Sequence, residues 1–164
     1  MKNLWNKKFE ASNVVKPKEI LDEQGKTLLE LTGGKILARA EEYDGPTRSY
    51  KSAGLMAGIS VLGEKEYNVQ DDLGEIDGSK FTYEFYITSI ATPNFKYRVM
   101  FVEHDITFYP LTITLDESIA KELVCKQYIS CDSEDEFLES LSGILNSDKI
   151  ESVINALLSI KTEE

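Results

Sequence analysis

Residues 81–113 read FTYEFYITSIATPNFKYRVMFVEHDITFYPLTI, and this stretch decides the fold. Apolar side chains occupy every second position in its first two runs, as is typical of strands with one buried face. The two apolar sets are Phe81, Tyr83, Phe85, Ile87 and then Phe95, Tyr97, Val99, Phe101. The stretch therefore predicts an antiparallel meander of three strands.

One pairing of the first two strands keeps both apolar sets on the same side of the sheet. It places Glu84 opposite Arg98 and Tyr86 opposite Lys96. A slip by one residue would turn the aromatic side chains of one strand into water. We therefore expect this register.

The second connection of the meander is then a two-residue hairpin turn at His104-Asp105. This turn places Phe101 opposite Phe108 in the next strand. Because Pro110 has no N–H to donate, we expect the third strand to lie at an edge of the sheet.

The segment before the meander predicts a helix and then a strand. Pro17 suits the first position of a helix, apolar residues follow at helical spacing, and Gly33-Gly34 ends it. Gly25 in the middle allows a rival interpretation, a turn at residues 24–25. Alternation over residues 35–43 then predicts a first strand.

The C-terminal third predicts the helices that cover the sheet. Thr114 with Glu117, and Ser133 with Glu136, match the capping box of a helix N-terminus. Residues 128–131 fit a short strand. Two apolar helical stripes, 137–145 and 150–158, flank Asn146-Ser147 and predict a helical hairpin. The sequence thus predicts an α+β fold: an antiparallel sheet of residues 81–113 and a strand near 35–43, packed with an N-terminal helix and this hairpin.

We expect a single domain over residues 1–164, with residues 1–14 flexible or peripheral. Twenty-nine acidic residues against eighteen basic ones give a net charge of -11. That charge argues against nucleic acid and anionic membranes as partners, and it favours a basic protein. The alternative is that the charge serves solubility alone.

Residues 1–10 do not resemble a secretory signal. The longest nearly apolar run, residues 53–62, is shorter than a membrane span. Cys125 and Cys131 fit neither a CxxC motif nor a zinc site, so two reduced thiols in a cytoplasmic protein are expected. No cofactor is expected.

Two clusters are candidates for metal or partner binding. The acidic loop carries Asp71, Asp72, Glu75 and Asp77, whose spacing differs from that of an EF-hand. It is a solvated loop, a contact for a basic partner, or a cation site. Glu103-His104-Asp105 has no second histidine to complete a metal site, which favours an exposed turn.

The mixed face of the meander is the other candidate interface. Aromatic side chains, methionine and arginine are enriched where proteins bind each other. The face carries Tyr86, Arg98, Met100 and Tyr109 in the predicted register. If helices lie on both sides of the sheet, this face is a second core instead.

The sequence leaves three hypotheses for function. The first is an acidic, non-catalytic protein-binding domain, such as a bacterial inhibitor, immunity-like or regulatory protein with a basic partner. The second is an enzyme or a domain that binds a small ligand or cation through the Gly-rich and acidic residues 54–78. The third is a homodimeric structural subunit.

Overall fold

A computed structural model describes residues 1–47, 73–74 and 80–160 of the chain. Within them, five strands form one sheet in the order β1-β2-β3-β4-β5, with every neighbouring pair antiparallel. The strands are β1 Ile36–Glu42, β2 Phe81–Ser89, β3 Tyr97–His104, β4 Leu111–Leu115 and β5 Tyr128–Cys131. The expected meander is confirmed, with β1 added at one edge and β5 at the other.

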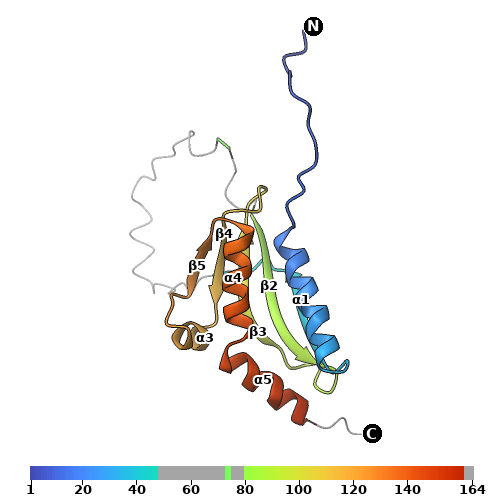
Figure 1. Ribbon diagram of the computed structural model, residues 1–164, viewed down its shortest axis with the longest axis vertical. Helices are drawn as coiled ribbons and strands as arrows, with labels where there is room; N and C mark the ends of the chain where they lie inside the picture. Colours follow the sequence, from blue (N-terminus) through green and yellow to red (C-terminus); the bar gives the residue numbers. More distant parts are fainter. Residues whose placement is uncertain (48–72, 75–79, 161–164) are drawn as a thin grey trace, which may run out of the picture.

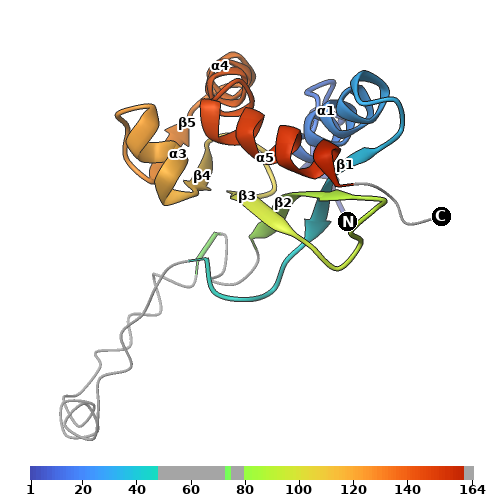
Figure 2. The same ribbon diagram turned by 90° about the horizontal axis from the view of Figure 1, so that it is seen from below.

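The helices of the described residues all lie on one side of this sheet (Figures 1 and 2). They are α1 Pro17–Leu31, α3 Glu117–Glu122, α4 Glu134–Leu145 and α5 Asp148–Ser159. The core lies between the two layers and includes Leu21, Phe85, Ile113, Phe137 and Ile144. The α+β prediction is therefore confirmed, and the helices of the described residues cover one face of the sheet.

Helix α1 runs through Gly25 without a turn, so the rival interpretation at residues 24–25 is wrong. A Cβ at Gly25 would overlap the backbone carbonyl of Ala38. The absence of a side chain thus lets α1 approach β1 closely. The helix ends before Gly33 and Gly34, which both have positive φ, as the sequence predicts.

The predicted register of β2 and β3 is wrong. Tyr86 lies opposite Arg98, two residues from its predicted partner. Glu84 lies opposite Phe101, because Val99 is an extra residue on β3 with no partner on β2. The carbonyl of Val99 instead accepts a hydrogen bond of 2.9 Å from the N–H of Asp116. This β-bulge reverses the alternation of β3 from that point onward.

The predicted two-residue turn at His104-Asp105 is also wrong. Residues 105–110 form the loop, and His104 pairs with Leu111. Asp105 starts the loop by accepting hydrogen bonds from the N–H and hydroxyl of Thr107. Pro110 therefore precedes β4, which lies inside the sheet between β3 and β5 and is not an edge strand.

The two predicted capping boxes differ in outcome. The Ser133 hydroxyl accepts from the N–H of Glu136 at 3.3 Å, and the Glu136 carboxylate accepts from the N–H of Asp132 at 2.7 Å. The capping box predicted at Thr114 and Glu117 is wrong, because Thr114 pairs within the sheet and α3 begins after Asp116.

The connection predicted at Asn146-Ser147 joins α4 to α5, and Ser147 caps α5. However, α5 crosses below the end of α4 and does not return along it (Figures 1 and 2). It contacts α3 and β1 instead. The two helices are consecutive, as expected, but they do not lie side by side.

Candidate functional site

The outer face of the sheet, opposite the helices, is the candidate site. In the described part of the chain no helix lies on that side (Figure 2). Its central residues come from three adjacent strands: Glu41 from β1, Glu84 and Tyr86 from β2, and Arg98 and Phe101 from β3. We call these residues, together with Tyr43 and Lys96, the outer-face cluster.

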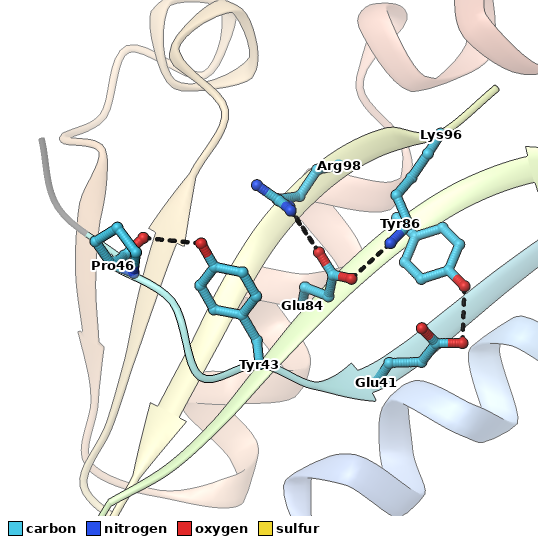
Figure 3. Close-up of polar contacts among 7 residues, drawn as sticks. All are labelled: Glu41, Tyr43, Pro46, Glu84, Tyr86, Lys96 and Arg98. Atoms are coloured by element: carbon cyan, nitrogen blue, oxygen red, sulfur yellow. Dashed lines mark hydrogen bonds and ion pairs between the residues drawn. The ribbon is translucent and has the colours of Figure 1, made fainter. Parts of the chain in front are cut away.

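Glu84 is the centre of the cluster (Figure 3). One carboxylate oxygen lies 2.6 Å from Nζ of Lys96, and the other lies 2.7 Å from a terminal nitrogen of Arg98. Arg98 Nε donates to that second oxygen at 2.8 Å, so two nitrogens of Arg98 share one carboxylate oxygen. The Glu84 side chain is only 8% exposed, whereas those of Lys96 and Arg98 are 41% and 43% exposed.

The charge of Glu84 is stabilised by these contacts. Burial acts to raise the pKa of the carboxyl group, but the bonds from Lys96 and Arg98 outweigh it and leave the pKa below its usual value. A general acid or base near neutral pH needs the opposite shift. Glu84 is therefore suited to holding two cations in place and not to proton transfer.

Aromatic rings surround the two cations. The guanidinium of Arg98 lies 4.9 Å from the ring centre of Phe101 and 5.1 Å from that of Tyr43. The centres of these two rings lie 4.6 Å apart, so the rings pack against each other. Lys96 Nζ lies 3.9 Å above the ring of Tyr86. Cation–π contacts of this kind orient the charged groups on the face.

Two further bonds fix the rim of the cluster (Figure 3). The hydroxyl of Tyr86 donates to Oε1 of Glu41 at 2.8 Å, and the hydroxyl of Tyr43 donates to the carbonyl of Pro46 at 3.1 Å. Burial and the bond to Glu41 raise the pKa of Tyr86. The phenol therefore stays protonated and acts as a donor.

The predicted interface residues do not all share this face. Tyr86 and Arg98 do. Met100 is 1% exposed in the core, since the bulge at Val99 turns it toward the helices, so its placement on the mixed face is corrected. Tyr109 lies in the β3–β4 loop, packed against the core. Its hydroxyl is buried without a hydrogen-bond partner in the described part of the chain, and burial helps to raise its pKa to about 12.

The acidic candidates Asp71, Asp72, Glu75 and Asp77 lie outside the described residues, as does the Gly-rich stretch 54–63. Tyr43 and Phe101 were missed by the sequence analysis. Phe101 lies in the run 99–102, where four apolar residues hide the alternation. Tyr43 stands at the end of β1, where the strand pattern ends.

His104 is buried, so the exposed turn expected for it is wrong. It is 4% exposed, and its ring stacks on Phe81 at 5.3 Å and meets the edge of Phe108 at 5.6 Å. Nδ1 lies 2.6 Å from the carbonyl of Asp105. His104 thus belongs to an aromatic cluster at the end of the sheet.

Residues 1–47, 73–74 and 80–160 contain no group of three histidine, cysteine or acidic side chains arranged to hold a metal ion. None of their helices combines the length and hydropathy of a membrane span.

The two cysteines differ in exposure. Cys131 is buried, and burial raises the pKa of its thiol, whereas Cys125 is exposed.

The border of the outer-face cluster beside β1 is acidic. The run Glu41-Glu42-Tyr43-Asp44 ends this strand. A hollow next to it is lined by Glu42, Asp44, Lys80 and Phe81, among others. Two carboxylates against one lysine leave this hollow with a net negative charge, which favours a lysine or arginine side chain from another protein.

Comparisons with protein-family models, with curated proteins and with solved structures returned no match to this chain.

Proposed function

We propose that this protein is a non-catalytic protein-binding domain that engages a basic protein through the outer face of its sheet. The observation that carries the proposal is the outer-face cluster, an arginine beside a pair of packed aromatic rings on a face that no helix of the described residues covers. Tyrosine and arginine are the residue types that most often dominate binding energy at interfaces.

The preference for a basic partner rests on charge. Arg98 and Lys96 share the one carboxylate of Glu84, so only part of their positive charge is balanced, and the acidic residues nearby decide the preference. The acidic border at residues 41–44 and the net charge of -11 attract cations. Such a field speeds the encounter with a basic surface and weakens as salt screens it. An inhibitor, immunity-like protein or regulator of a basic protein would act through binding of this kind.

The test is affinity capture from the native cell extract with three versions of the protein. Wild type is compared with Tyr43→Ser/Phe101→Ser, which removes both rings around Arg98. The control is Glu117→Gln/Lys121→Gln, which removes an exposed ion pair on α3 without changing the net charge.

We expect wild type and the control to retain the same basic protein at low salt and to release it as salt rises. Loss of two interface rings should weaken binding at least about thirtyfold, since a single central aromatic residue already contributes about 2 kcal/mol. Equal capture by the Tyr43/Phe101 variant, or an acidic protein as the specific partner, would contradict the proposal.

A further inference from the structure

An apolar groove lies on the helix side of the molecule, between α1 and α4. Its floor includes Phe85 and Ile87 of β2, and its walls include Leu28 of α1 and Leu141 of α4. The cavity measures about 320 Å³. That is near the lower end of pockets for small molecules, so it suits one or two large side chains.

The rim of the groove is apolar and unusually exposed. Leu31 is 80% exposed and Leu138 is 40% exposed, although both line the groove. Side chains of this type normally contact other apolar groups, and a patch of them rimmed by polar residues marks a binding surface.

The helix α4 side of the groove is acidic. Glu134 and Asp135 precede Leu138 by four and three residues, so they share its face of the helix. Residues 132–151 contain seven acidic residues and one basic residue, Lys149. On α1, the exposed Lys26 is paired with Glu23 at 3.3 Å. The groove therefore favours an occupant that is both apolar and basic.

The same chain carries a segment with these properties. Residues 1–16 hold four lysines against one glutamate. Their large apolar side chains are exposed to solvent: Leu4 is 83% exposed, Trp5 is 76% exposed and Phe9 is 74% exposed. The rings of Trp5 and Phe9 pack edge to face, with their centres 5.8 Å apart, so the two side chains form one apolar surface.

This N-terminal arm points away from its own groove. In Figure 1 it runs beyond the start of α1, whereas the groove lies beside the second half of that helix, which contributes Gln24, Thr27, Leu28 and Leu31. Lys16 has extended backbone, with φ -70° and ψ 140°, and the proline after it disfavours a helical turn there. Two β-branched residues, Val14 and Val15, come before it.

We propose that the N-terminal arm of a second copy of this chain occupies the groove, with Trp5 and Phe9 as anchors and the arm lysines against the acidic α4. Exchange of the two arms about a two-fold axis satisfies both grooves at once. This inference goes beyond the proposed function, because the groove and the outer-face cluster lie on opposite sides of the sheet.

Trp5 is the single tryptophan of the chain, so its fluorescence reports on the arm directly. We expect blue-shifted emission at high protein concentration and a red shift on dilution. Light scattering should show twice the 18.5 kDa of one chain under the blue-shifted condition. Raising the salt from about 0.05 M to about 0.5 M should favour the monomer by screening the arm lysines.

Two variants block the two halves of the contact. Trp5→Ser/Phe9→Ser changes only the arm, which lies outside every helix and strand. Leu138→Arg places a charge in the groove at a half-exposed position. Each should raise the dimer dissociation constant at least about tenfold, as expected for loss of a central anchor. Ile106→Arg, at a 67% exposed loop position, is the control and should leave the dimer intact.

Mixing the two variants distinguishes the exchange of arms between two copies from an arm that folds back into the groove of its own chain. The Leu138→Arg copy keeps its arm, and the Trp5→Ser/Phe9→Ser copy keeps its groove, so the emission of Trp5 should shift to the blue only after mixing. Blue emission from a monomer at every dilution would overturn the proposal in favour of the chain's own arm. Red emission throughout, or a dimer in which Trp5 stays exposed, would also overturn it.

Discussion

The two faces of one sheet are ordered by different forces. On the inner face, Phe85 and Met100 are buried beneath helices and make contacts that depend on shape and area. On the outer face, Glu84 and Tyr86 are also buried, at 6% and 7% exposure, but their closest partners are charged and aromatic side chains of the same face. Burial alone therefore does not identify the core. Substitutions on the inner face should act at any pH, whereas those on the outer face should depend on ionisation.

The two faces should differ most in the free energy of unfolding lost by Phe85→Ala on the inner face and by Phe101→Ala on the outer face. Phe85 is 1% exposed and touches the core, so its removal should lower the free energy of unfolding by about 3–5 kcal/mol. Phe101 is only half-buried on the outer face, and its loss should cost about 1 kcal/mol. Urea denaturation measures both. Equal losses would mean that the outer face is a second core.

Gly25→Ala tests how closely the inner layer is packed. The new methyl group would overlap the carbonyl of Ala38, which should destabilise the protein by about 1–3 kcal/mol in spite of the better helix propensity of alanine. Gly143→Ala in α4 is the matched control, because its Cβ would meet no atom within 4 Å. That change should stabilise by about 0.5–1 kcal/mol. Thermal melts of the pair would refute the close approach if both variants gained stability.

Glu84→Gln tests the ionic character of the outer face. The loss should be about 1–2 kcal/mol at pH 7, because Lys96 and Arg98 are partly in water and screening limits their attraction. The pKa of Glu84 is lower in the folded protein than in the unfolded chain. Its contribution is therefore present above about pH 4.5 and is lost as the pH falls through the folded pKa.

Urea titrations at several pH values give the comparison for Glu84→Gln. Wild type should lose its advantage over the variant as the pH falls below about 4.5, since the carboxylate is protonated when the pH passes through its lowered pKa. A constant difference across this range would show that the ionic bonds contribute nothing.

Tyr86→Phe should have the smallest effect. It removes the hydroxyl that donates to Glu41 but keeps the ring beneath Lys96. Because Glu41 is exposed and regains water, the loss should be about 0.5–1 kcal/mol. A double-mutant cycle with Glu41→Ala, which removes the acceptor, measures the coupling, and a coupling of zero would show that the bond is not formed in solution.

The sequence predicts the elements well, because their signals are local. Pro17 and Gly33-Gly34 bound α1, and Ser133 with Glu136 starts α4, as their side chains dictate. The proximity of Glu84 and Arg98 was also expected, although for the wrong register. A long arginine side chain reaches its partner along a diagonal as well as directly across the strands.

What the sequence hides is the result of long-range packing. The bulge at Val99 lies inside an apolar run, so no alternation reveals it, and its carbonyl finds a donor only when the start of α3 docks beside β3. The placement of Met100 and Phe101 depended on that one residue. The groove between α1 and α4 was likewise invisible, since it requires the positions of two helices far apart in the sequence.

The most direct test of the account is the reactivity of single cysteines placed along β3, because the bulge assigns each residue to a face. In a Cys125→Ser background, with Cys131 buried, cysteine replaces Arg98, Met100 or Phe101 in turn. The account predicts that thiols at 98 and 101 react rapidly. A thiol at 100 should react at least about a hundredfold more slowly, because a buried thiol reacts only when the surrounding structure opens locally. Rapid reaction at 98 and 100 with protection at 101 would contradict the bulge and, with it, the outer-face cluster.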